Sequence, residues 1–259
     1  MSIWMTAIAA TLGIGTLLIG AAIGWFWDIP RPIVAGVMAF GAGVMVATLA
    51  LELVVEAADG GGVWPVVVGF AGGAVLYVWG DWFIGHLSQK RVASARQKAS
   101  SETGSRNVTA RRGGDSPGDG AAIAVGALLD GIPEAIVIGL SAATGNFPVA
   151  IVVAIGLSNV PEGLAGTMPL KRSGRSVKWI FGLWSGITLL AVVAAVVGSA
   201  VLQNAPAELI AVIISLAAGA LLAMVCNAMI PEAFEQDHRM TGLLATAGFL
   251  AAFVLNRLT

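Results

Sequence analysis

Charged residues are scarce in this chain, and their scarcity is the first constraint on what the protein can be. Asp, Glu, Lys and Arg make up 11% of the residues, whereas 57% are hydrophobic and the mean hydropathy is +0.87. A soluble globule of 259 residues needs far more polar surface than this, so the composition predicts an integral membrane protein. The formal net charge of −1 gives no sign of a nucleic-acid partner, and we expect none.

Other absences exclude further classes. The single cysteine, Cys226, rules out an intramolecular disulfide framework. The two histidines, His86 and His238, fall at the ends of apolar runs, so an intramembrane hydrolase with a His-Glu-x-x-His set is not expected. No Gly-x-x-x-x-Gly-Lys-Ser/Thr sequence occurs, which removes the usual ATP-binding loop. We therefore expect neither an enzyme nor a prosthetic group.

What the chain does contain is a series of apolar runs of about 20 residues, the length that crosses a bilayer as a helix. These runs predict an all-α polytopic membrane protein with a single membrane domain over residues 1–259, placed in the cell membrane as a multi-pass protein. The eight predicted spans are Ile3–Trp27, Ile33–Val55, Val63–Ile84, Ala121–Ala143, Phe147–Pro169, Trp179–Leu202, Leu209–Ile230 and Thr241–Leu255.

Lys and Arg are distributed very unevenly between the two sides of these spans. Every one except Arg257 falls in the connections on one side, most of them in the segment 85–120 and in the turn 171–178. The positive-inside rule makes this side cytoplasmic, and eight spans then put both termini outside. We expect the basic segment 85–120, between spans three and four, to be a cytoplasmic loop that is disordered from Ser88 onward.

Two related motifs lie inside predicted spans four and five. Leu-Asp-Gly-Ile-Pro-Glu-Ala occupies 129–135, and Leu-Ser-Asn-Val-Pro-Glu-Gly occupies 157–163. The two spans cross in opposite directions, so the motifs form an inverted repeat. A weaker repeat relates Gly43 and Glu56 of span two to Gly219 and Glu232 of span seven, with equal spacing. Inverted repeats with interrupted helices are typical of secondary transporters.

The chemistry of the motifs indicates a cation site. A carboxylate at the bilayer centre costs about 2.5–3.5 kcal/mol on insertion scales, and two facing carboxylates repel each other unless a proton or a cation lies between them. Residues four apart share a helix face, and Pro133 and Pro161 free backbone carbonyls in the same layer. The predicted metal ligands are Asp130, Glu134, Ser158, Asn159 and Glu162, and the residues predicted to line a pathway are Glu52, Glu56, Asn227 and Glu232. Oxygen donors favour Mn²⁺, Fe²⁺ or Mg²⁺, although Zn²⁺ also accepts carboxylates.

With these residues the chain resembles the ZIP (Zrt/Irt-like) family of divalent metal transporters, including at Ala218-Gly-Ala and Met229-Ile-Pro-Glu-Ala. The resemblance implies eight helices, outside termini, a long cytoplasmic loop after helix three and a metal site between helices four and five. It also implies that Asp130 stands where the family usually has His, and Gly131 where it usually has Asn. Because no carboxylate follows Ser185-Gly186, we expect one bound metal rather than two.

The sequence thus predicts transport of a divalent cation (Zn²⁺, Fe²⁺, Mn²⁺ or a similar ion) toward the cytoplasm by alternating access. A proton-coupled antiporter of monovalent cations is the alternative, because such proteins also use buried carboxylates. The expected partners are the transported metal ion and the lipid bilayer, with a homodimer left open.

Overall fold

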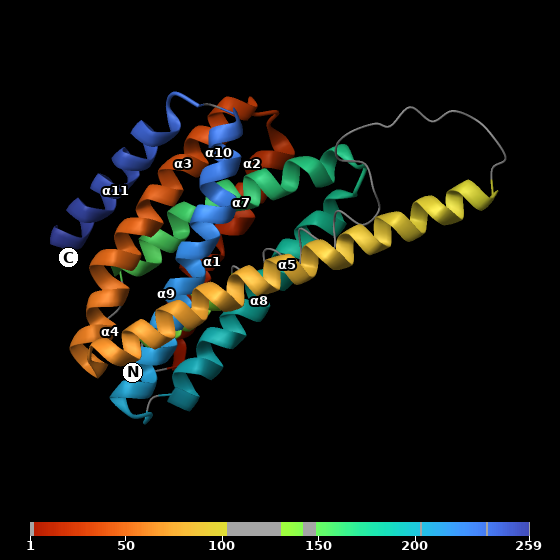
Figure 1. The fold of residues 1–259 in the computed structure, drawn as a ribbon. Helices are drawn as coiled ribbons and strands as arrows, with labels where there is room; N and C mark the ends of the chain where they lie inside the picture. The colour runs from red at the N-terminus through yellow and green to blue at the C-terminus, as the bar shows by residue number, and fades with distance from the viewer. Residues whose placement is uncertain (1–2, 103–130, 142–148, 203, 237, 259) are drawn as a thin grey trace.

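A computed structural model describes residues 3–102, 131–141, 149–202, 204–236 and 238–258, and this part of the chain is helical, with no strands (Figure 1). Spans one to three comprise α1 (Ile3–Ile14), α2 (Thr16–Phe26), α3 (Arg31–Thr48), η1 (Leu49–Leu53), α4 (Val54–Gly61) and α5 (Val63–Glu102). The later helices are Gly131–Ser141, α7 (Val149–Arg172), α8 (Val177–Leu202), α9 (Ala207–Met224), η2 (Val225–Met229), α10 (Ile230–Gln236) and α11 (Thr241–Leu258).

The all-helical, membrane-type fold predicted from hydropathy is confirmed. Within the described residues, seven helical segments are long and apolar enough to cross a membrane. The eighth, Gly131–Ser141, is a shorter apolar helix that falls inside predicted span four, Ala121–Ala143, whose other residues up to 130 lie outside the described part. Spans two and seven are longer than predicted, because their helices continue as Arg31–Gly61 and Ala207–Gln236.

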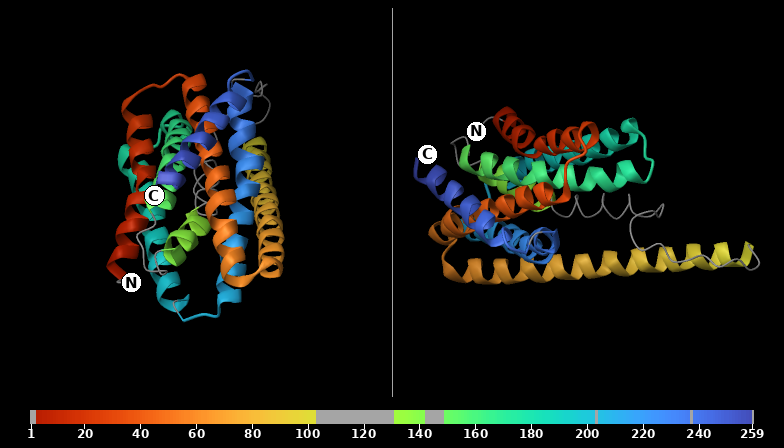
Figure 2. Two further views of the ribbon diagram at one scale, coloured as in Figure 1. Left: turned by 90° about the vertical axis from the view of Figure 1, so that its left-hand side faces the viewer. Right: turned by 90° about the horizontal axis from the view of Figure 1, so that it is seen from above.

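The third apolar segment, Val63–Phe83, agrees with predicted span Val63–Ile84 to within one residue, but the helix that contains it is longer than the span. We expected a helix ending at Ile84 and disorder from Ser88, but α5 continues as one helix to Glu102 and projects beyond the bundle (Figures 1 and 2). The correction has a physical reason: residues 88–102 contain Lys, Arg, Gln and Ala, which favour helix, and neither Pro nor Gly to end one. Residues 103–120 of the predicted loop lie outside the described part.

Spans two and seven have the same internal construction. Each begins after a proline N-cap, Pro30 for α3 and Pro206 for α9, and each runs for 18 residues of α-helix. Both then pass into a five-residue π-helical turn, η1 or η2, before returning to α-helix. The π-turns therefore occupy equivalent positions in the two spans, where the sequence shows only a weak repeat. Single π-turns inside α-helices are frequently found at functional sites.

Close glycine contacts extend this equivalence to the neighbouring helices. A Cβ atom on Gly43 of α3 would collide with the backbone of Ala245 in α11, and one on Gly219 of α9 would collide with the backbone of Phe70 in α5. Small residues let membrane helices approach this closely. The pair α3 and α11 is thus packed like the pair α9 and α5, and Figure 2 shows α5 running beside α9 along one side of the bundle.

The helices separate into two packed groups. α1 and α2 pack on α7 and α8, while α3 and α9 pack on α11 and α5 respectively. Helix Gly131–Ser141 belongs to the first group, because Ile138 contacts Gly13 and Gly139 packs on Ala195. The principal contact between the groups is that of α3 with α7. This contact lies next to the Pro-Glu motif of α7, because Gly41 of α3 faces the Pro161 ring.

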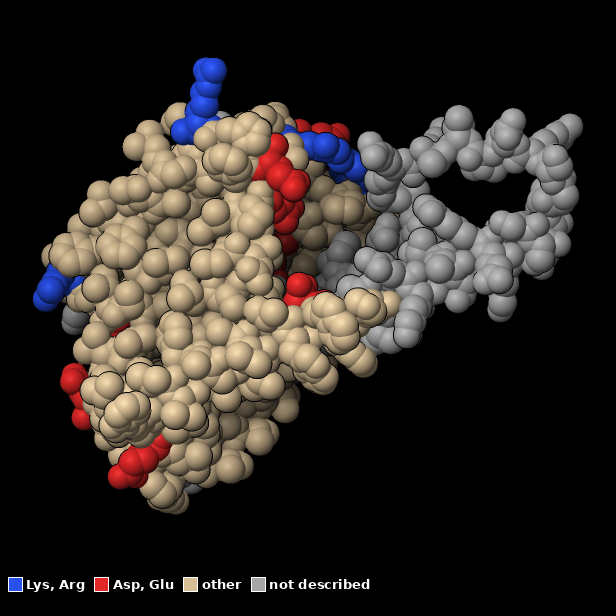
Figure 3. Space-filling model, in the orientation of Figure 1, with Lys and Arg blue, Asp and Glu red and all other residues tan. Residues whose placement is uncertain are grey.

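Charge also divides the structure into two ends. Both chain termini lie at the end of the bundle where α5 begins (Figures 1 and 2). Arg31, Arg172, Lys178 and Arg239 lie at the opposite end, near the start of α3, the end of α7 and the starts of α8 and α11. In Figure 3 most of the visible surface is uncharged, and acidic side chains form a column beside α10. Such a surface suits a lipid environment with polar residues confined to the ends and to a path between helices.

Candidate metal site

One face of α7 packs directly against α2, and this contact sets how α7 is rotated about its axis. A Cβ atom on Gly20 of α2 would collide with the carbonyl of Val160, and one on Gly163 would collide with the backbone of Leu17. α2 and α7 are therefore in backbone contact along this face. Val160 and Gly163 make this contact with α2. Ser158, Asn159 and Glu162 belong to the same helical turns but point in other directions around the helix axis.

Asn159 and Glu134 bring the two motifs into direct contact. The side-chain amide of Asn159 donates a hydrogen bond to Oε2 of Glu134, with a nitrogen to oxygen distance of 2.9 Å. Both side chains are buried, at 1% exposure each. The sequence repeat aligned Asn159 with Gly131, but in the structure its partner is the carboxylate one turn farther along the opposing helix.

The carbonyl oxygen of the same amide, Asn159 Oδ1, has no hydrogen-bond partner among the described residues. A buried polar atom left in this state costs about 1–3 kcal/mol, which a native fold rarely leaves unmet. A neutral amide that donates to a carboxylate and keeps its own oxygen free has the ligand chemistry that hard and borderline cations use. The pair therefore offers a carboxylate and a carbonyl oxygen in one dry place.

Ser158 and Glu162 stand next to this pair on α7. Ser158 is 2% exposed, and its hydroxyl donates to the carbonyl of Ile155 at 2.9 Å, which leaves oxygen lone pairs available. Glu162 is half-buried rather than fully buried. The two glutamates of the repeat therefore have different surroundings: Glu134 is enclosed, whereas Glu162 is partly open.

α3 lines the other side of this part of α7. A Cβ atom on Gly41 would come to 3.4 Å from the Pro161 ring and 3.4 Å from the Ser158 backbone. Pro161 lies inside α7, so the carbonyl of Leu157 lacks its helical donor, as the sequence predicts. The candidate site thus lies at the junction of helix Gly131–Ser141, α7 and α3, on the boundary between the two helix groups.

Asp130, the remaining predicted ligand, lies outside the described residues. In the described part of the chain, no three His, Cys, Asp or Glu side chains come together as a preformed metal cluster. The candidate ligands there are Glu134 and Asn159, which are in direct contact, together with Ser158 and Glu162 on neighbouring positions of α7. Asp130 comes directly before helix Gly131–Ser141 and remains a predicted ligand.

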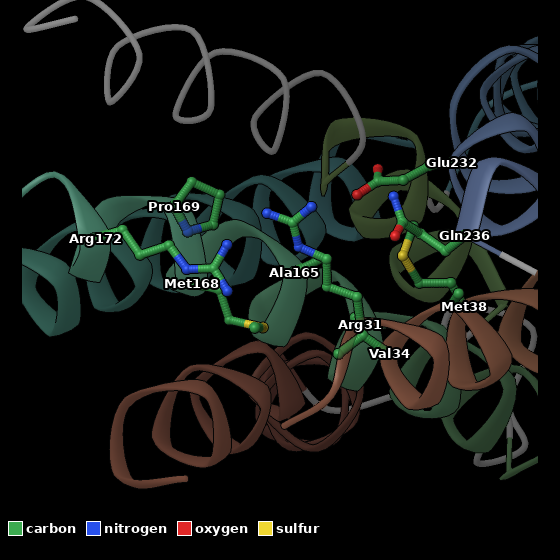
Figure 4. Close-up of a pocket in the computed structure, with 10 residues that line it drawn as sticks. Arg31, Val34, Met38, Ala165, Met168, Pro169, Arg172, Glu232 and Gln236 are labelled. Carbon is green, nitrogen blue, oxygen red and sulfur yellow. The ribbon is translucent and has the colours of Figure 1, made fainter. Parts of the chain in front are cut away.

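The predicted pathway residues fall in or near the two π-turns. Glu52 lies in η1 and accepts a hydrogen bond at 2.9 Å from the amide of Asn256 in α11, and Glu56 follows in α4. Asn227 lies in η2 and is exposed, while Glu232 in α10 lines a cavity at the basic end (Figure 4). Sequence reasoning missed Asn256, although an amide near the end of an otherwise apolar span was a usable signal.

Comparison with known proteins shows that the sequence matches no protein-family model and no curated protein. The assignment of function therefore depends on the geometry and on the sequence resemblance.

Proposed function

We propose that this protein is a secondary-type transporter that moves a divalent metal cation toward the cytoplasm, as its resemblance to ZIP transporters implies. The observation that carries the proposal is the buried contact between Asn159 and Glu134, with an amide oxygen left without a partner beside a carboxylate. A bound divalent cation stabilises this arrangement, because it satisfies the oxygen atoms and offsets the charge of the carboxylate.

The position of the pair supports transport rather than static binding. Glu134 and Asn159 lie in the first helix group, and α3 of the second group packs next to them at Gly41. A relative movement of the two groups changes which end of the bundle the site faces. The two π-turns, at equivalent places in α3–η1–α4 and α9–η2–α10, both lie in the second group and give its two central spans an irregular helix geometry.

The types of ligand atom also determine which metal ions we expect the protein to prefer. Carboxylate, amide and hydroxyl oxygens favour Mn²⁺, Fe²⁺ or Mg²⁺, and Zn²⁺ is also bound by carboxylates. With one enclosed glutamate and one half-open glutamate, the described residues suit a single metal ion.

The test is an uptake assay with purified protein in liposomes, using a panel of Mn²⁺, Fe²⁺, Zn²⁺, Mg²⁺, Na⁺ and K⁺, with protein-free liposomes as the control. The proposal predicts saturable uptake of at least one divalent ion. Exchange of Na⁺ or K⁺ for protons in divalent-free buffer, without divalent flux, would instead establish the monovalent antiporter. Saturable metal binding without flux would show a sensor or a structural protein.

A further inference from the structure

A cavity of about 200 Å³ opens between α3, α7 and α10 at the basic end of the bundle. Figure 4 shows two arginines reaching into it from different helices: Arg31 from the start of α3 and Arg172 from the end of α7. Their guanidinium groups point toward the same part of the cavity, beside Pro169. Two like charges are thus brought together in one recess.

Neither guanidinium group is neutralised within the described part of the chain. The salt bridge recorded there joins Lys171 to Asp28 at 2.9 Å, which pairs the neighbouring lysine and leaves both arginines without an acidic partner. Arginine presents a planar fork of donors that matches phosphate oxygens. The recess therefore has the charge and the donor geometry of a phosphate-binding site.

The surrounding residues place the recess at the level of the lipid headgroups. The Lys171 ammonium lies 5.9 Å from the ring centroid of Trp25, and the Arg175 guanidinium lies 4.7 Å from that of Trp179. Tryptophan and basic side chains at helix ends mark the membrane interface, and basic residues mark its cytoplasmic side. Basic pockets between membrane helices on that side are suited to anionic lipid headgroups.

The lower wall of the cavity is apolar. Val34 and Met38 of α3 and Met168 of α7 line it, and Val34 and Met38 are buried against the neighbouring helices. A free phosphate gains nothing from this wall, whereas a phospholipid can lay its glycerol and upper acyl chain against it. Glu232 and Gln236 line the side belonging to α10, so a phosphate group is favoured at the arginines and disfavoured near Glu232 (Figure 4).

We propose that this cavity is a binding site for an anionic phospholipid, with the phosphodiester on Arg31 and Arg172 and the upper acyl chain against Met38 and Met168. This proposal does not depend on metal transport. It concerns lipid binding in the cavity at the basic end, and that binding is measured in the absence of metal.

The experiment measures binding of dioctanoyl phosphatidylglycerol to the purified full chain in detergent by native mass spectrometry and calorimetry. Dioctanoyl phosphatidylcholine and inorganic phosphate serve as separate probes. Wild-type protein is compared with the double variant Arg31→Gln/Arg172→Gln. A charge-matched control, Lys178→Gln/Arg257→Gln, removes two positive charges outside the cavity. A third variant, Arg31→Lys/Arg172→Lys, keeps the charge.

Each basic residue near an anionic surface contributes a factor of about five in affinity, so the glutamine pair should weaken phosphatidylglycerol binding about 25-fold. The control should change it less than about threefold, and the lysine pair should retain most of the binding. Equal losses in the glutamine pair and the control would overturn the proposal. So would phosphatidylcholine binding as tightly as phosphatidylglycerol, or inorganic phosphate binding as tightly as the lipid, which would make free phosphate the ligand.

Discussion

The side-chain amide of Asn159 lies 2.9 Å from Oε2 of Glu134, and it joins the two helices that carry the related Pro-Glu motifs. Because both residues are buried at 1% exposure, the contact is formed without water competing for it. The amide nitrogen donates to the carboxylate, and the amide oxygen has no hydrogen-bond partner among the described residues. This single contact brings the two sequence motifs together in the structure.

Replacing Asn159 tests whether the amide is a ligand as well as a structural donor. Asn159→Ala removes the donor to Glu134 and the free oxygen, so we expect metal affinity to fall at least about tenfold. The loss of a buried hydrogen bond to a charged group also costs about 1.5–3 kcal/mol of stability. Calorimetric metal titration and thermal unfolding in detergent measure the two effects, with exposed Asn204→Ala as the matched control. Unchanged affinity in the destabilised Asn159 variant would reduce the residue to a structural role.

Asp130 stands where the family that the sequence resembles usually has His. Asp130→His should raise the preference for Zn²⁺ over Mn²⁺, because an imidazole nitrogen is a better donor than a carboxylate oxygen for a borderline-soft ion. Competition uptake with both ions measures the ratio, and Asp59→His, at an exposed position in α4, is the control. If the ratio for Asp130→His equals that of the control, residue 130 does not contact the metal.

Two adjacent glycines of α5 test the close packing between α5 and α9. A Cβ atom on Gly73 would collide with the backbone of Leu216, whereas one on Gly72 would have nothing within 4 Å. Gly73→Ala should therefore destabilise the protein by about 1–3 kcal/mol through overpacking. Gly72→Ala should stabilise it by about 0.5–1 kcal/mol, because alanine favours helix over glycine. Thermal unfolding of both variants checks this, and equal shifts would mean that the two helices are not in backbone contact.

Metal binding should depend on pH in a defined direction. Carboxylates must lose their protons before they bind a cation, so Glu134 and Glu162 should bind metal more weakly as the pH falls, and binding should release protons. Titrations between about pH 5 and 8, in buffers of different ionisation enthalpy, measure both quantities, and the apparent values belong to the coupled group. A flat affinity with no proton release over that window would show a site that is already ionised and hydrated.

Hydropathy was enough to predict most of the fold, because a bilayer requires long apolar helices and few other structures satisfy it. The matched Pro-Glu motifs predicted Glu134 and Glu162 as metal ligands, and that assignment stays a prediction, although the structure does bury Glu134 against Asn159. Neither π-turn was predicted, since Leu49–Leu53 and Val225–Met229 carry no proline or glycine to mark an irregular helix. Their location is set by packing between helices far apart in the sequence.

The details of the candidate site likewise depend on packing between distant helices, which the local sequence does not show. Sequence symmetry treats Glu134 and Glu162 as equivalent, but in the structure Glu134 is buried and accepts the hydrogen bond from Asn159, whereas Glu162 is only half-buried. The hydrogen bond between Asn256 and Glu52 joins residues 204 positions apart in the sequence, and no local pattern predicts it.

The most direct test of the central claim is metal uptake by Glu134→Gln in proteoliposomes. Glutamine keeps the shape of the side chain and can still bond to Asn159, but it removes the charge that holds a cation. The control is Glu208→Gln, an equal loss of charge at an exposed residue in the first turn of α9. The account predicts that Glu134→Gln, folded and present at wild-type amounts, loses at least about 99% of saturable uptake, corresponding to about 2.7 kcal/mol, while Glu208→Gln transports normally. Uptake by Glu134→Gln at the wild-type rate would contradict the account.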